Sequence, residues 1–266
     1  MHNYLQPQTI GDVLRNTFVI YGRNFVAILL IYLLPILPLQ LFQLEAKSAN
    51  NTALYIAAYI AGIVAGLFAF GAIAVAVSDI CLGNKPRVVR SYGKVFNTTG
   101  GKLLVTNCLV VLCWGIPALP LFIFPARLGN ATANTKMAMV IAMIVSVIVV
   151  TIIVLRLLFS CLVVVLEGLW AVKALERSVA LVRGFNWRNF AVAVLLWVIV
   201  LVSWVAIITP FTLLHVKSMI VTHIFMAVIA VVTLPLFFIA AVLLYYDSRV
   251  RNEAYDNAAL AEDLRR

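Results

Sequence analysis

The chain has 266 residues, of which 64% are hydrophobic and only 11% are charged. A soluble domain carries about 25% charged residues, so this composition and a mean hydropathy of +1.08 exclude a soluble domain and predict a polytopic, all-α membrane protein. The net charge of +10 comes from basic residues in short segments beside apolar runs. This distribution argues against a nucleic-acid-binding patch and favours contact with anionic lipid headgroups.

The expected elements begin with an amphipathic helix. Thr9 and Asp12 have the spacing of a capping box, with aspartate where glutamate is usual, so a helix along the membrane surface should begin near Ile10. Apolar runs follow, and the six predicted spans are residues 25–42, 53–77, 103–124, 141–166, 190–208 and 219–246. In the second span, Gly62 and Gly66 have GxxxG spacing, which predicts the close approach of another helix there.

A second amphipathic helix is expected within residues 79–102. Arg87, Arg90 and Lys94 follow one another at spacings of three and four and would form one basic face. Residues 97–101 combine Asn, Thr and Gly, so they should end this helix before the third span.

A third amphipathic helix is expected within residues 168–190, with apolar side chains opposite a charged stripe. Trp170 and Trp187 have the ring type that settles at the level of the headgroups, and Gly184 is placed to close the helix. The basic members of the stripe are Lys173, Arg177 and Arg183.

These elements make three copies of one unit, in which an amphipathic helix along the membrane interface precedes a helical hairpin. The copies cover about residues 9–82, 83–167 and 168–247. A charged tail, residues 248–266, follows and should be helical. The matching acidic residues at the ends of the hairpins are Asp79, Glu167 and Asp247. We expect them to pair at the interface with Arg90, Arg177 or Arg249, in preference to acting as a proton or cation relay.

The distribution of basic residues assigns both termini to the cytoplasm. Most of the 20 lysines and arginines lie on the side of the termini, and the opposite loops contain Lys47, Arg127, Lys136 and Lys217. The amphipathic helices would then lie on the inner leaflet, where each basic residue is attracted by about 1 kcal/mol. The candidate lipid contacts are Arg15, Arg87, Arg90, Lys94, Lys173, Arg177 and Arg183.

Arg156 is the basic residue expected inside a span. It lies about ten residues, or about 15 Å, before the end of the fourth span, which predicts that its side chain faces the interior of the bundle. Ser160 and Glu167 follow at helical spacings, so the three residues would form a polar strip on one face. The alternative is a later-starting span from which Arg156 reaches the headgroups.

Two stretches, VVLEGLWAVKALERSVALVRGFNWRNF and YYDSRVRNEAYD followed by LAEDL, resemble a known family. It is the membrane-domain family associated with glycerophosphoryl diester phosphodiesterases, whose members also occur as stand-alone bacterial six-span proteins. The resemblance implies a multi-pass protein of the bacterial inner membrane. It does not extend to the catalytic barrel, since the His-Arg-Gly of that active site has no counterpart at His2, His215 or His223.

The sequence favours a non-enzymatic membrane module that binds anionic lipid or a protein partner through its basic helices. The spans contain no nucleophile with its base, no paired carboxylates and no metal-ligand spacing, so we expect no catalytic site, cofactor or metal. The alternative is a transporter or lipid-translocating protein. That function requires polar residues deep in the spans, and Arg156 is the clear candidate.

Overall fold

A computed structural model describes residues 4–49, 51–127, 132–184, 186–213, 219–253 and 255–264. Helices make up 87% of the structure, and these ranges contain no strand. The elements in chain order are α1 (Ile10–Arg23), α2 (Phe25–Ser48), α3 (Thr52–Cys81), α4 (Val88–Lys94), the π-helix η1 (Val95–Thr99), α5 (Gly100–Arg127), α6 (Ala133–Arg156), α7 (Ser160–Leu162), the π-helix η3 (Val163–Glu167), α8 (Val172–Val182), α9 (Asn186–Leu213), α10 (Met219–Glu253) and α11 (Asn257–Asp263).

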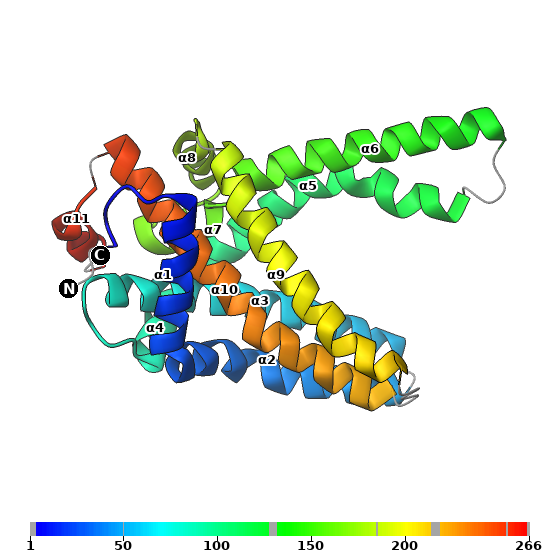
Figure 1. Cartoon of the computed structure of the whole chain (residues 1–266), viewed down its shortest axis with the longest axis horizontal. Coiled ribbons are helices and arrows are strands. Elements are labelled where there is room, and N and C mark those ends of the chain that lie inside the picture. The colour runs from blue at the N-terminus through cyan, green and yellow to red at the C-terminus, as the bar shows by residue number, and fades with distance from the viewer. Residues whose placement is uncertain are drawn as a thin grey trace.

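The long helices pair as three hairpins, α2 with α3, α5 with α6, and α9 with α10 (Figure 1). Two of the hairpins lie against each other, because α10 contacts both α2 and α3, whereas the α5–α6 hairpin extends away from them. The short helices α1, α4, α8 and α11 gather at one end of the molecule, at the left in Figure 1. We call this end the polar end.

Several helices are long and apolar enough to cross a membrane, which is compatible with a multi-pass membrane protein. Five such spans occur among the described residues, at Phe25–Lys47, Thr52–Cys81, Gly100–Pro125, Asn134–Glu167 and Val231–Glu253. A sixth is obtained when α8 and the beginning of α9, which meet at 94°, are counted as one broken span. The total of six spans and their grouping into three repeats remain predictions.

The buried core lies where α3, η3 and α10 meet near the polar end. Residues 71–79, 163–166 and 239–249 are buried at every position, so these segments are enclosed on all sides. Burial differs greatly between the hairpins: 67% of the span in α10 is buried, but only 6% of the spans that begin in α5 and α6. The polar side chains of the core segments are therefore shielded from water by the surrounding protein.

Gly71 permits the close packing of this core. A Cβ atom at this position would lie 3.2 Å from Cγ2 of Val165 and 3.3 Å from both Cγ atoms of Val95, which is tighter than ordinary van der Waals contact. A Cβ atom at Gly66 would meet nothing within 4 Å, and one at Gly62 would meet the flexible end of Gln43. The predicted approach of another helix at the GxxxG pair is therefore found at Gly62, where the distance to Nε2 of Gln43 is 3.1 Å and Gln43 of α2 also donates to the carbonyl oxygen of Ala58, but not at Gly66.

The capping box at the start of α1 is confirmed. The side chain of Thr9 accepts a hydrogen bond from the backbone N–H of Asp12, and the Asp12 carboxylate accepts one from the backbone N–H of Thr9 at 3.1 Å. The expected helical tail is also present, as α11.

One predicted boundary is wrong. Residues 97–101 do not end a helix, because the chain continues from α4 through η1 into α5. Val95 is fully buried against the core, and this packing outweighs the weak helix propensity of the residues that follow. The predicted end of the fourth span at residue 166 agrees with the candidate span Asn134–Glu167, although α6 ends at Arg156 and residues 157–159 form a turn before α7.

Candidate functional site

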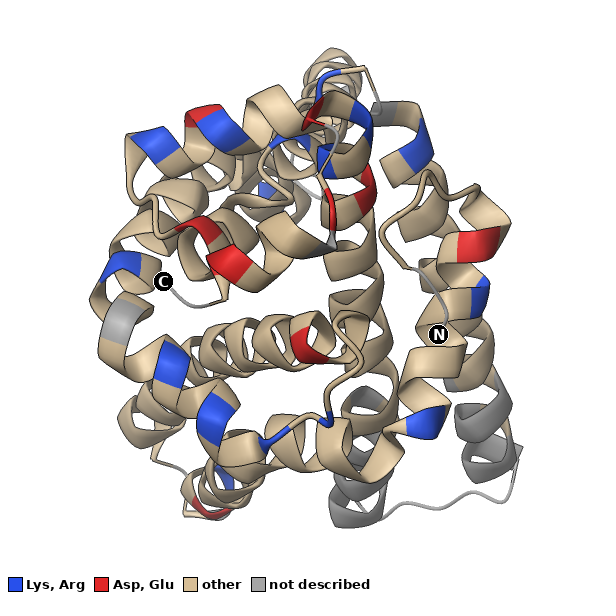
Figure 2. Ribbon diagram, turned by 90° about the vertical axis from the view of Figure 1, so that its left-hand side faces the viewer, with Lys and Arg blue, Asp and Glu red and all other residues tan. Residues whose placement is uncertain are grey.

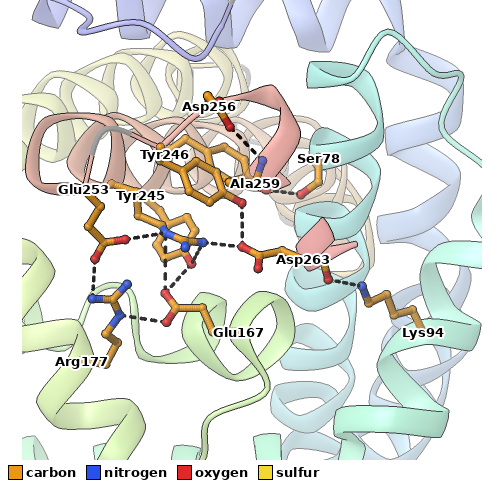
Figure 3. A network of polar contacts seen from close by, with 12 residues as sticks. Ser78, Lys94, Glu167, Arg177, Tyr245, Tyr246, Glu253, Asp256, Ala259 and Asp263 are labelled. Carbon is orange, nitrogen blue, oxygen red and sulfur yellow. Dashed lines mark hydrogen bonds and ion pairs between the residues drawn. The ribbon is translucent and has the colours of Figure 1, made fainter. Parts of the chain in front are cut away.

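A cluster of charged side chains occupies the polar end, where the core segments meet the short helices (Figure 3). We call it the ion network, and its members are Glu167, Arg177, Tyr245, Arg249, Glu253 and Asp263. Tyr245, Arg249 and Glu253 are spaced by four residues along α10, so they share one face of that helix. The other members come from η3, α8 and α11, and the network therefore joins four elements.

Arg177 connects two carboxylates within the network. Its Nε lies 2.8 Å from Oε2 of Glu167, and its Nη1 lies 2.5 Å from Oε1 of Glu253. The hydroxyl of Tyr245 donates a hydrogen bond of 2.7 Å to the other carboxylate oxygen of Glu167. Both oxygens of Glu167 are bonded, which offsets the cost of removing this carboxylate from water.

Arg249 is the second cation of the network. Its Nε lies 3.1 Å from Oε2 of Glu253, and its Nη1 lies 2.6 Å from Oδ2 of Asp263. The guanidinium also stacks over the ring of Tyr255, 3.7 Å from the ring centroid, which is a cation–π contact. Opposite charges thus alternate from α8 through α10 to α11.

The end of the chain packs onto this network through α11. Tyr255 donates a hydrogen bond of 2.7 Å to Asp263, and Lys94 of α4 donates to the carbonyl oxygens of Asp263 and Leu264 at 3.1 and 3.0 Å. Burial lowers the pKa of Lys94, and the nearby Arg90 lowers it further. Burial also raises the pKa of Tyr255, as does its hydrogen bond to Asp263. Both effects are typical of groups that lie within protein.

A second cluster surrounds Asp247, which is fully buried. Its Oδ1 accepts a hydrogen bond of 2.6 Å from the backbone N–H of Gln8, and its Oδ2 is paired with Arg188 and, at 2.9 Å, with Arg251. Arg188 and Arg251 also donate to the carbonyl oxygen of Gln8, at 3.1 and 2.8 Å. The cluster connects the segment before α1 to the beginning of α9 and to α10.

The structure places the three predicted interface acids in different surroundings. Asp79 is buried, with Nη2 of Arg90 at 3.6 Å, and Glu167 is paired with Arg177 as described above. The pairing of Asp247 with Arg249 is corrected, because Asp247 pairs with Arg188 and Arg251 instead. A residue two positions along a helix points to the other side, whereas Arg251, four positions along, shares the face of Asp247.

The predicted polar strip on the fourth span is not formed. Arg156 is exposed, which corrects the expectation that it faces the interior of the bundle. The hydroxyl of Ser160 donates to the carbonyl oxygen of Leu157 at 2.7 Å, and Glu167 belongs to the ion network. The turn at residues 157–159 is the physical reason, because residues on either side of it no longer follow one helical repeat.

Ser178 of α8 holds this turn in place. Its hydroxyl donates a hydrogen bond of 2.9 Å to the carbonyl oxygen of Arg156 and accepts one of 3.1 Å from the backbone N–H of Phe159. Ser178 is fully buried, so these bonds are shielded from water. The backbone groups left over by the break between α6 and α7 are thereby satisfied.

The seven candidate lipid contacts divide into two groups. Arg177 and Lys94 are bonded within the protein, and Arg90 lies near Asp79. The other four are Arg15, Arg87, Lys173 and Arg183, which are exposed, as is Arg90 itself. The apolar sides of α1 and α8 pack in part into the core, whereas Phe18 of α1 and Val172 of α8 are 44% and 58% exposed. Trp170 and Trp187, however, are 50% and 78% exposed.

Sequence analysis did not single out Tyr245, Glu253, Asp263 or Gln8. One local signal existed, because Arg249 and Glu253 have the i, i+4 spacing of a helical ion pair. No local signal could identify Gln8, which is separated from its partner Asp247 by 239 positions.

Comparisons with known proteins return no match: no protein-family model, no curated protein and no solved structure matches this chain. The resemblance to the phosphodiesterase-associated membrane domain therefore stays a prediction. Within the ranges that the structure describes, no group of three or more His, Cys, Asp or Glu side chains could hold a metal ion. His2, His215 and the side chain of His223 lie outside the description.

Proposed function

We propose that this chain is a non-enzymatic membrane module that binds anionic lipid at its polar end. In this proposal both termini lie in the cytoplasm, and the polar end faces the inner leaflet of a bacterial inner membrane. The resemblance in residues 164–190 and 245–256 supports that location. Figure 2, which looks onto the polar end, has lysine and arginine distributed around its short helices.

The observation that carries the proposal is a set of exposed cations beside exposed tryptophans. Lys173 and Arg183 are exposed near Trp170 and Trp187 in the sequence, and Arg87 is exposed before α4. Tryptophan prefers the headgroup region, and basic residues are attracted to anionic headgroups. The cations of the ion network, in contrast, are neutralised by protein carboxylates and are less able to attract lipid.

We do not propose transport as the function. Transport would require a polar path through the bundle, and the sequence offered Arg156 as the interior residue of that path. The side chain of Arg156 is exposed instead. The other charged clusters gather around the polar end, and none of their described contacts requires a path along the spans.

The test compares two charge-matched double variants in anionic-lipid retention. Lys173→Gln/Arg183→Gln removes two cations at the polar end, and Arg127→Gln/Lys136→Gln removes two at the far end of the α5–α6 hairpin. Each protein is purified in mild detergent, and its bound phosphatidylglycerol is quantified by mass spectrometry at low and high salt.

We expect the polar-end variant to retain about thirtyfold less phosphatidylglycerol at low salt, since each of the two cations is worth about 1 kcal/mol. The difference should shrink at high salt because the attraction is screened. Equal retention by the two variants would contradict lipid binding at the polar end. A protein partner that is lost together with the two cations would favour the partner-binding alternative.

A further inference from the structure

The last described segment of the chain, residues 255–264, is held at the polar end by the contacts of Asp263 and by the burial of Tyr255, Leu260 and Leu264 in the core. Asp263 accepts from Arg249 at 2.6 Å and from Tyr255 at 2.7 Å, and its carbonyl oxygen accepts from Lys94 at 3.1 Å. Figure 3 shows Asp263 between the network and Lys94. We call residues 255–264 the tail segment.

The charges at this place balance only while the tail segment is bound. The ion network and Lys94 have equal numbers of positive and negative side chains, namely Lys94, Arg177 and Arg249 against Glu167, Glu253 and Asp263. All of these except Asp263 come from the body of the protein. Departure of the tail segment would therefore leave one positive charge in excess at a partly buried site, which is unfavourable unless another anion enters.

The two cations that Asp263 contacts would be left with free hydrogen-bonding capacity. Arg249 would keep Glu253 at its Nε but would lose the carboxylate at its Nη1. Lys94 would lose the two carbonyl oxygens of Asp263 and Leu264. A guanidinium and an ammonium that reach the same residue are the donors that bind a phosphate oxygen.

We propose that the carboxylate of Asp263 occupies an anion-binding site formed by Arg249 and Lys94 of the same chain. When the tail segment is released, the phosphate of an anionic lipid headgroup binds to this site instead. The tail segment then acts as a cover whose position depends on the lipid composition of the membrane. This inference rests on the proposed function, because it assumes that anionic headgroups gather at the polar end. It adds a specific binding site for the headgroup, for which the Asp263 carboxylate of the chain itself competes.

Leu260 provides a direct readout of release. It is 1% exposed while the tail segment is bound, so a cysteine at this position can react only when the segment has left. The experiment uses Leu260→Cys in the full chain, with Cys81, Cys108, Cys113 and Cys161 replaced by alanine. The rate of thiol labelling is measured in nanodiscs of phosphatidylcholine, of phosphatidylglycerol, and of phosphatidylcholine with added inorganic phosphate.

We expect labelling about tenfold faster in phosphatidylglycerol than in phosphatidylcholine, with the difference reduced by high salt. A response to phosphatidylglycerol alone would assign the site to a lipid headgroup. A response to inorganic phosphate in phosphatidylcholine would assign it to free phosphate. Equal rates under all three conditions would overturn the proposal.

Two neighbouring charge changes serve as site-specific variants. Asp263→Asn should speed labelling in phosphatidylcholine about tenfold and remove the response to phosphatidylglycerol, because the variant lacks the carboxylate that holds the tail segment at the anion site. Glu262→Gln removes the same charge from an exposed neighbour and should change both rates much less than Asp263→Asn does. Identical behaviour of the two variants would show that Asp263 occupies no specific site.

The results separate this inference from the proposed function. If Lys173 and Arg183 are needed for lipid retention but labelling at position 260 ignores the lipid, the proposed function stands and the anion site fails. If labelling responds to free phosphate while lipid retention is independent of Lys173 and Arg183, the anion site stands and the proposed function fails.

Discussion

The hydroxyl of Tyr245 lies 2.7 Å from Oε1 of Glu167, and this hydrogen bond joins the last long helix to the π-helix η3. Tyr245 is fully buried, and its ring meets Phe159 edge-on, with ring centroids 5.8 Å apart. The same tyrosine oxygen accepts from Nη1 of Arg249 at 3.3 Å. One hydroxyl therefore links a carboxylate and a guanidinium in the core of the polar end.

Tyr245→Phe should lower the free energy of unfolding by about 1–3 kcal/mol, because it leaves one oxygen of the partly buried Glu167 without its hydrogen-bond donor. Chemical or thermal unfolding in detergent measures the change. Tyr59→Phe is the matched control, since Tyr59 is 55% exposed on α3. A loss no larger than that of the control would argue against a stabilising role for the hydrogen bond.

Ser178→Ala should destabilise the protein by about 1–3 kcal/mol, because it removes the side chain that bonds the backbone on both sides of the α6–α7 turn. Arg156→Gln should change the stability by less than about 0.5 kcal/mol, since the Arg156 side chain is exposed. The two unfolding curves can be compared directly. A larger effect at Arg156 than at Ser178 would restore the interpretation of Arg156 as an interior residue.

Gly71→Ala should destabilise the fold by about 1–3 kcal/mol, because the new Cβ would press on Val165 and Val95 in a closely packed core. Gly66→Ala meets no neighbour within 4 Å and should stabilise α3 by up to about 1 kcal/mol through helix propensity. Unfolding temperatures of the two variants provide the measurement. Similar shifts in both would mean that α3 is not closely approached at Gly71.

The capping box predicts an acid-dependent contribution to stability. Hydrogen bonds from the side chain and the backbone of Thr9 lower the pKa of Asp12 below its ordinary value of 3.8. A carboxylate with a depressed folded-state pKa stabilises the fold above its unfolded pKa, and the contribution is lost as the pH falls through the folded value. The stability difference between the wild type and Asp12→Asn should therefore be constant above about pH 5 and shrink below pH 4. A difference that does not change with pH would contradict this role for Asp12.

The features that were correctly predicted depend on residues close together in the sequence. Thr9 and Asp12 are three positions apart, so their capping box is decided within one helical turn. The apolar runs are likewise local, and they form long helices of the kind that can cross a membrane. Burial of single residues was harder to predict, as Arg156 shows. A turn of three residues, held by Ser178 of α8, interrupts the helix directly after that side chain.

By itself the sequence determined the helical class, the apolar helices and the local helix starts, because hydrophobic burial and hydrogen bonding within a helix act over short separations. Only the tertiary structure decided which charges meet. Tyr245 and Glu167 are 78 positions apart, and Gln8 and Asp247 are 239 positions apart. Composition and helical periodicity carry no information about such pairs. Their contacts follow from the packing of α10 against η3, α8, α11 and the segment before α1, where removal from water requires each charge to find a partner.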